Sequence, residues 1–222
     1  MKKIVSLLLT MLLICSFAAC QKKEHTHTFS EAMDADATSH FFVCECGEKK
    51  DAAAHSLVDG RCSVCHAEIA EQEDGIVSVS FYDENGVLKS GKRYENDRLA
   101  WEGEYAVGTD GYAVEISGID YFEDGSKIVY TNNKQGYIET QTFYNKEGKA
   151  LSVTNNEYEF DGDGNVTIVR SYTDNVLTGM DEYKPADDGI NYLYKNTSYN
   201  ADGTTTVTEY NELGEVISEV TK

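Results

Sequence analysis

Histidine and cysteine are missing from the greater part of this chain. The sequence has 222 residues, and its six cysteines and five histidines all lie at or before residue 66. Nucleophilic catalysis of the Ser-His-Asp or Cys-His type needs a histidine base, so residues 67–222 cannot supply either arrangement by themselves. Carboxylate pairs remain available for glycoside chemistry, but acidic residues are so numerous that no particular pair stands out. The sequence therefore predicts a protein that is not an enzyme.

Positive charge is scarce as well. The chain has 19 Lys and Arg against 39 Asp and Glu, which gives a formal net charge of -20. A polyanion repels the phosphate backbone, and no basic cluster is larger than Lys22-Lys23 or Lys92-Arg93. Nucleic acid is therefore excluded as a partner, and the acidity is typical of a soluble domain outside the cell.

Long hydrophobic runs are limited to one, at the N-terminus. Two lysines at residues 2–3 precede an apolar run at residues 4–17, which is too short to span a bilayer as a stable helix. A charged region, an apolar region and small residues in this order indicate a signal peptide over residues 1–19. No later stretch is long enough for a transmembrane helix, so the sequence predicts an exported chain.

The end of this segment specifies how the exported chain is held. Residues 17–20, Phe-Ala-Ala-Cys, resemble the bacterial lipobox, in which small residues precede a cysteine that receives a diacylglycerol thioether. Phe17 departs from the pattern, since leucine is more usual there. The resemblance implies a mature chain that begins at lipidated Cys20 and is tethered through residues 20–24 to the extracytoplasmic face of a bacterial cell membrane. The alternative is an ordinary secretory peptide cut after Ala19, which leaves Cys20 as a free thiol.

The remaining chain divides into two regions by composition. Cysteine and histidine end at residue 66, whereas all fifteen tyrosines lie at or after residue 82. An acidic stretch at residues 67–75 separates the two regions. We therefore expect a small Cys/His-stapled module at residues 25–72 and a tyrosine-rich domain at residues 73–222.

Two cysteine pairs in the module have the spacing of zinc ligands. They are Cys-Glu-Cys-Gly at residues 44–47 and Cys-Ser-Val-Cys at residues 62–65. Two thiolates on one tight turn can bind a single ion, so each pair is typical of half a zinc site. We expect one structural zinc, with thiolates as first-choice ligands and histidines as substitutes or as members of a second site. The candidate ligands are Cys44, Cys46, Cys62, Cys65, His55 and His40.

Two alternatives use the same cysteines. Exported chains oxidise their thiols, and two disulfides joining positions 44 and 46 to positions 62 and 65 would staple a core this small equally well. Residues 62–66, Cys-Ser-Val-Cys-His, also match the c-type haem attachment motif, but their surroundings are too polar and too short to form a haem pocket. The zinc interpretation is favoured over both.

The order of these elements resembles a short His/Cys-rich module found in exported proteins of Gram-positive bacteria. That module has a His-x-His start, a central histidine followed by Cys-x-Cys-Gly, an Asp-x-x-x-His spacer and an Asp-Gly-x-Cys-x-x-Cys end. In this chain the elements stand at residues 25–27, 40–47, 51–55 and 59–65. His66 departs from the pattern, because glycine usually follows the second cysteine pair.

The tyrosine-rich domain contains an internal repeat. An aromatic-x-x-x-Gly pattern starts at residues 82, 121, 160 and 199, so each start follows the last by 39 residues. The identities are more numerous at an offset of 78 residues, which indicates a tandem duplication. Short alternating apolar runs are bounded by Asp-Gly, Asn-Gly and Glu-Gly turns, the pattern of antiparallel hairpins. We expect about a dozen short strands in an all-β meander, three per 39-residue unit, so that strand direction inverts from unit to unit.

The hairpins, with Tyr-Asp-Glu-Asn-Gly-Val-Leu at residues 82–88 as the clearest, resemble the tyrosine-aspartate (YD, or Rhs-type) repeats of bacterial surface proteins and, more loosely, MORN-like repeats. The resemblance implies a curled sheet that acts as a shell, spacer or binding surface. Large aliphatic residues are few, so a thin sheet with cross-strand tyrosine contacts is expected rather than a thick two-layer sandwich.

These patterns together predict a lipid-anchored surface protein with a structural zinc module and a non-enzymatic repeat sheet that acts as a spacer or binding domain. The expected partners are the membrane, through the lipid on Cys20, and a glycan or protein ligand on the sheet. Two alternatives are a carbohydrate- or cell-wall-directed enzyme and a zinc-handling lipoprotein.

Overall fold

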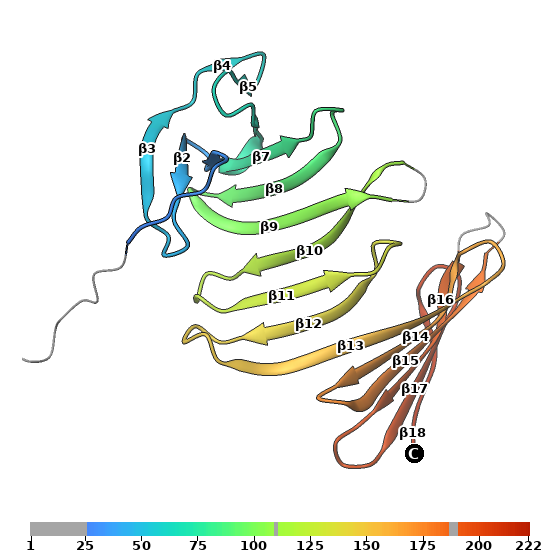
Figure 1. Ribbon diagram of the computed structural model, residues 1–222. Helices are drawn as coiled ribbons and strands as arrows, with labels where there is room; N and C mark the ends of the chain where they lie inside the picture. Colours follow the sequence, from blue (N-terminus) through green and yellow to red (C-terminus); the bar gives the residue numbers. More distant parts are fainter. Residues whose placement is uncertain (1–25, 109–110, 187–190) are drawn as a thin grey trace, which may run out of the picture. The chain divides into compact units, whose positions relative to one another are not determined.

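The computed structural model describes residues 26–108, 111–186 and 191–222 (Figure 1). Cys20 and His25 lie outside these ranges. The described residues form β-strands, turns and one short 3-10 helix, η2 (Glu73–Gly75), with no α-helix among them. Within the same ranges, no helix has the length and apolar character needed to cross a membrane. The prediction of an all-β protein is confirmed.

The chain forms two compact units. Of the described residues, 26–34 and 39–54 belong to the smaller unit, and 35–38 and those from 55 onward belong to the larger. A three-stranded sheet has the order β1 (Asp34–Ala35), β2 (Ser39–Val43), β3 (Lys49–Ala54). On β2 the side chains of His40 and Phe41 are buried, while β3 is exposed along its whole length.

A fifteen-stranded antiparallel sheet accounts for most of the larger unit. Its strands lie side by side in the order of the sequence, with β4 and β18 as the edges (Figure 1). They are β4 (Leu57–Val58), β5 (Arg61–Cys62), β6 (Glu68–Glu71), β7 (Ile76–Tyr82), β8 (Leu88–Glu95), β9 (Arg98–Val107), β10 (Ala113–Tyr121), β11 (Lys127–Asn132), β12 (Ile138–Tyr144), β13 (Ala150–Phe160), β14 (Val166–Thr173), β15 (Val176–Pro185), β16 (Asn191–Tyr199), β17 (Thr205–Tyr210) and β18 (Val216–Thr221). The sheet starts earlier than the boundary expected at residues 72 and 73, because β4 to β6 pair into it.

The duplication is visible in the strand register. Gly103 pairs with Gly118 between β9 and β10, and Asp181 pairs with Asn196, each 78 residues later, between β15 and β16. Both strand pairs also have a register shift at the equivalent place, between Glu115 and Ser117 in the first. Each 39-residue step advances the chain by three antiparallel strands, so strand direction inverts between neighbouring units as the sequence predicted.

The hairpin turns repeat one local structure. In the first, the Asp83 carbonyl accepts from Gly86 N at 3.0 Å, and Asp83 Oδ1 accepts from Asn85 N at 2.9 Å and Val87 N at 2.8 Å. Gly86 has φ of 80°, a left-handed conformation that glycine adopts without a steric penalty. Asp83 N also donates to the Val87 carbonyl at 2.8 Å. The same two backbone hydrogen bonds, from residue one to residue five and from residue four back to residue one, close the loops at residues 133–137, 145–149, 161–165, 200–204 and 211–215.

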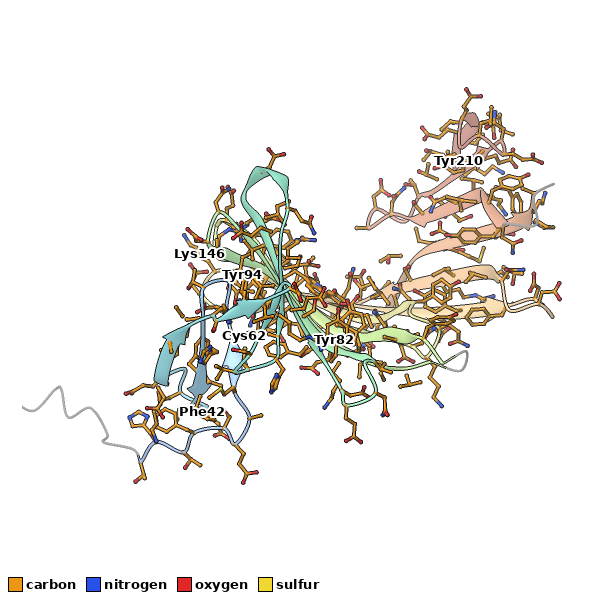
Figure 2. All side chains as sticks on the ribbon, turned by 90° about the horizontal axis from the view of Figure 1, so that it is seen from above. Phe42, Cys62, Tyr82, Tyr94, Lys146 and Tyr210 are labelled. Carbon is orange, nitrogen blue, oxygen red and sulfur yellow. The ribbon has the colours of Figure 1, made fainter. Side chains whose placement is uncertain are left out.

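Apolar burial is concentrated at the start of the sheet. The core cluster contains Ala35, Ala67, Ile69, Val79 and Tyr94, and Val79 and Cys62 are the largest side chains that are fully buried. Strands β12, β13, β15 and β18 carry no buried residue, so both of their faces reach solvent. Figure 2 shows side chains projecting from both sides of the strands. Most of the sheet is therefore a single layer, as the shortage of large aliphatic residues predicted.

Candidate metal centres and two hollows on the sheet

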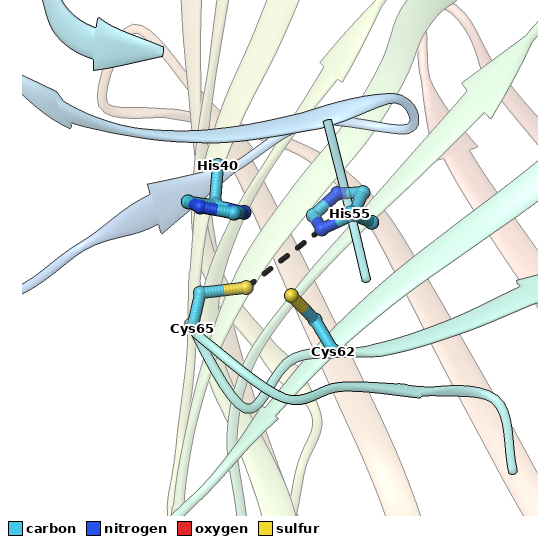
Figure 3. A group of neighbouring side chains, drawn as sticks. All are labelled: His40, His55, Cys62 and Cys65. Carbon is cyan, nitrogen blue, oxygen red and sulfur yellow. Dashed lines mark hydrogen bonds between the residues drawn. The ribbon is translucent and has the colours of Figure 1, made fainter. Parts of the chain in front are cut away.

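Four side chains of the Cys/His-rich region form a group that could hold a metal ion. The ligand atoms of His40, His55, Cys62 and Cys65 all lie within 4.8 Å of one another (Figure 3). Cys62 ends β5 and is fully buried, Cys65 lies in the tight turn that follows, and His55 lies just before β4. Two thiols and two imidazoles form a ligand set that is typical of tetrahedral zinc.

The imidazole of His55 is oriented for metal binding. Its Nε2 donates to the Asp36 carbonyl oxygen at 2.9 Å, and because a carbonyl can only accept, the proton is on Nε2. Nδ1 then carries the lone pair and lies 3.9 Å from Cys65 Sγ. Zinc–ligand bonds of about 2.3 Å to sulfur and 2.1 Å to nitrogen give a tetrahedral edge of roughly 3.6 Å. A small contraction would therefore bring these two atoms to ligand spacing.

A second group contains three ligands, His27, Cys44 and Cys46, whose ligand atoms also lie within 4.8 Å of one another. His27 Nδ1 lies 3.3 Å from Cys46 Sγ, and its Nε2 lies 3.2 Å from Glu48 Oε2. A carboxylate behind a histidine fixes the tautomer and the ring orientation of many metal ligands. A hollow of about 370 Å³, lined by Thr28, Cys44 and Cys46 among others, leaves one side of this group open.

One cysteine of each pair is the more acidic thiol. The Cys46 backbone amide donates to the Cys44 sulfur and lowers the pKa of Cys44 to about 6, against the opposing effect of burial. Burial acts to raise the pKa of Cys62, but hydrogen bonds from backbone amides, first that of Cys65, outweigh it and lower that pKa to about 5. Burial raises the pKa of Cys65. Since the thiolate is the form that binds metal, each group offers one ligand already charged near neutral pH.

The structure divides the predicted ligands differently from the sequence analysis. The four thiolates do not form one group, because Cys44 and Cys46 assemble with His27 while Cys62 and Cys65 assemble with His40 and His55. The four described cysteines are free thiols, so the disulfides considered from the sequence are not formed. His27 was missed as a ligand, although the His-x-His start of the resembling module marks its position. His66 belongs to neither group and has φ of 62°.

Two hollows lie on the repeat sheet, and they are named first and second by their order along the sequence. The second hollow has a volume of about 510 Å³, and its lining includes Tyr137, Asn156, Tyr158, Ser171, Asp181 and Tyr183. The rings of Tyr137 and Tyr158 are in contact at a tilt of 30° with centroids 5.3 Å apart, and the Tyr158 hydroxyl donates to the Ile138 carbonyl at 2.7 Å. Asn191 also lines this hollow, and its Oδ1 is buried without a hydrogen-bond partner.

The first hollow has a volume of about 540 Å³, and its lining includes Ser78, Ser80, Lys92, Arg93, Trp101 and Tyr105. Trp101 is the chain's single tryptophan. Its Nε1 donates to Tyr130 Oη at 2.8 Å, and that hydroxyl donates to Glu115 Oε1 at 2.7 Å. Trp101 and Tyr105 meet edge to face with centroids 6.3 Å apart. The indole is therefore held in a fixed orientation at the wall of the hollow.

Similarity to known proteins is limited to solved structures with low TM-scores. No family model matches the chain, and no curated protein matches it. Among solved structures, it is similar to a porin-like protein from Bacteroides uniformis, with 18% identity and a TM-score of 0.23 over 70% of this chain and 56% of that one. It is also similar to the Photorhabdus luminescens Tc holotoxin pore, with 11% identity and a TM-score of 0.24 over 86% of this chain and 11% of that one. The chain spans less than two thirds of either protein, and likenesses at these TM-scores carry no argument about function.

Proposed function

We propose that this chain is a lipid-anchored protein on the extracytoplasmic face of a bacterial membrane, with a structural zinc module and a repeat sheet that acts as a non-enzymatic binding or spacer domain. The observation that carries the proposal is the single-layer sheet. Its strands expose both faces and bear two aromatic-walled hollows. A scaffold whose side chains are this accessible suits ligand binding or presentation better than chemistry that needs a water-excluding site.

Zinc at His40, His55, Cys62 and Cys65 is supported by the ligand set and by the oriented His55 ring. Elemental analysis of the full chain, purified without added metal and run beside a thiol count, tests it. One tightly held zinc per chain is expected, and Cys62→Ser should lose it because one missing thiolate opens the tetrahedral shell. Cys46→Ser, outside this group, is the matched control and should retain that zinc. Four oxidised cysteines without metal would replace the zinc proposal with the disulfide one.

The anchor is proposed from the N-terminal residues alone. Labelling of cells with a radioactive fatty acid should mark the wild-type protein, and Cys20→Ser should abolish the label, because the modified thiol is the recognition element. Cys15→Ser, in the apolar segment five residues earlier, is the matched control and should stay labelled. Unchanged labelling of the Cys20 variant would contradict the anchor.

A second candidate function is zinc handling, and the three-ligand group favours it. His27, Cys44 and Cys46 leave one side open to a hollow, so an ion held there has a position at which a fourth ligand can exchange. A chelator titration separates the candidates. A purely structural role gives one slowly released zinc, whereas handling requires a second ion that is released rapidly and is lost in Cys46→Ser.

A further inference from the structure

The two hollows occupy equivalent places in the duplicated sheet. Six of their lining positions are separated by 78 residues, the period of the duplication. Among these pairs are Ser78 with Asn156, Ser80 with Tyr158, and Tyr105 with Tyr183. A hollow that recurs at the same place in both copies is a property of the repeated architecture and not an accident of one strand pair.

Each hollow has an aromatic platform, but the platforms come from different strands. In the first, Trp101 on β9 lies over Gly91, where an added Cβ would come within 3.2 Å of the indole. The position equivalent to Trp101 is Gly179 on β15, which leaves the second hollow without that ring. There the contacting rings of Tyr137 and Tyr158 supply the aromatic surface instead. Both copies thus retain a flat aromatic surface beside polar groups, although the residue that supplies it has changed.

The features shared by the hollows indicate the class of ligand. Charge is not shared, because Arg93 and Asp120 carry opposite charges in the first hollow, whereas Asp181 has no cationic counterpart in the lining of the second. What recurs is an aromatic face together with hydroxyl and amide side chains, such as Ser78 in the first copy and Asn156 in the second. A pyranose ring has apolar C–H faces that stack on aromatic rings and hydroxyls that pair with amides. Both volumes fall within the roughly 300–1,000 Å³ usual for small-ligand sites.

We propose that the two hollows are equivalent sites for a neutral, pyranose-containing glycan, one in each copy of the duplication. A quaternary ammonium ligand would suit Asp181 and the tyrosines of the second hollow. The first hollow suits it less, because the cationic Arg93 offsets the negative charge of Asp120 there. In the second hollow, a ligand hydroxyl would also supply the donor that the buried Asn191 Oδ1 lacks. The inference rests on the proposed binding role of the sheet and names its ligand.

Calorimetric titration of the full chain with neutral hexaoses of glucose, mannose, xylose and N-acetylglucosamine tests the proposal. At least one of these is expected to bind at two sites per chain. Because Trp101 is the single tryptophan, its fluorescence reports the first hollow alone, and a shift that saturates with the calorimetric signal is expected. Trp101→Ala should leave one site, with binding at the other hollow unchanged.

Gly179→Val tests the second hollow with little risk to the fold. An added Cβ there would meet Ser171 Cβ and the Thr197 carbonyl oxygen at 3.9 Å, which is ordinary contact, and valine favours strands. The side chain shares its face with Asp181, so it should fill the hollow and weaken that site at least tenfold, while the Trp101 signal persists. Tyr112→Ala, an aromatic that is 75% exposed and lines neither hollow, should keep two sites.

Three results would overturn the proposal. They are the absence of binding across the hexaose panel, a single site per chain, or two sites that Gly179→Val leaves intact. Tighter binding of tetramethylammonium than of any hexaose would replace the ligand class. None of these outcomes affects fatty-acid labelling or zinc content, so failure here is distinguishable from failure of the proposed function.

Discussion

The Cys/His-rich region and the later repeat sheet meet the shortage of large aliphatic residues in different ways. Residues 26–72 bring together two His/Cys groups. Three other side chains of this region, Ala35, Ala67 and Ile69, form a small apolar cluster with Val79 and Tyr94. Strands β13 to β18 have almost no buried apolar side chains and depend on backbone pairing and polar contacts. Tyr194 Oη, for example, donates to Glu182 Oε2 at 2.8 Å. The stability of the Cys/His-rich region is therefore concentrated in a few groups of side chains, whereas that of the later repeat sheet is distributed over many strand pairs.

Metal removal should separate the two regions most sharply. A segment of about 50 polar residues cannot bury enough apolar area to fold unaided, and structural zinc contributes on the order of 10 kcal/mol to such modules. We expect a chelator to abolish protection from amide hydrogen exchange at residues 39–62 while β10 to β18 stay protected. Equal loss of protection along the whole chain would show that the sheet depends on the metal too.

Deletion of one repeat period should have the next largest effect, and its position should matter. Removal of residues 118–195 joins Ser117 to Asn196 at an equivalent register and leaves the Val79 cluster untouched, so a shorter folded sheet is expected. Removal of residues 79–156 is equally long but places Glu157 where fully buried Val79 stands. The second deletion should be markedly less stable in urea unfolding, because it puts a carboxylate in the place of a fully buried apolar side chain.

If both deletions unfold completely, the sheet has one global core and the distributed description is wrong. If both are equally stable, the Val79 cluster contributes less than its burial indicates.

Much of the sheet could be predicted from local sequence, because hairpins are local structures. Glycine and Asx residues at fixed spacing determine the turns, as Asp83 and Gly86 show, and the 39-residue period gives the strand count. For the two metal groups, the sequence could predict which kinds of residue serve as ligands but not how they are divided between the groups. Spacing shows that Cys44 and Cys46 share a turn, but which histidine faces them depends on chain segments that come together in the fold. The residues next to Trp101 and Gly179 in the sequence do not indicate a binding site either. That the two residues occupy equivalent positions becomes clear only when the lining residues of the two hollows are compared at an offset of 78 residues.

A pair of valines tests the contrast within the sheet itself. Val79→Ala should lower the free energy of unfolding by about 2 kcal/mol, because the side chain is fully buried and its removal leaves a cavity. Val220→Ala, on β18 with a side chain that is 47% exposed, should cost less than about 0.5 kcal/mol. Urea unfolding of the two variants measures both values. Equal costs would mean that burial is not concentrated at the start of the sheet.

The smallest effects are expected at the two cysteine turns, and they should have opposite signs. Both turns require a left-handed residue after the second cysteine, and that residue is Gly47 in one turn, with φ of 86°, and His66 in the other, with φ of 62°. A side chain in this conformation costs roughly 1 kcal/mol relative to glycine. His66→Gly should therefore raise the free energy of unfolding by up to about 1 kcal/mol, offset in part by the greater freedom of glycine in the unfolded chain.

Gly47→Ala is the converse variant and should lower stability by about 1 kcal/mol through backbone strain alone, since an added Cβ at Gly47 would meet nothing within 4 Å. The zinc content of His66→Gly shows whether His66 only strains the backbone of its turn or also binds the metal. The His66 imidazole lies outside both ligand groups, so His66→Gly should keep its zinc while its thermal midpoint rises. Loss of zinc in this variant would make His66 a ligand, and the turn would then be held in its left-handed conformation by the metal.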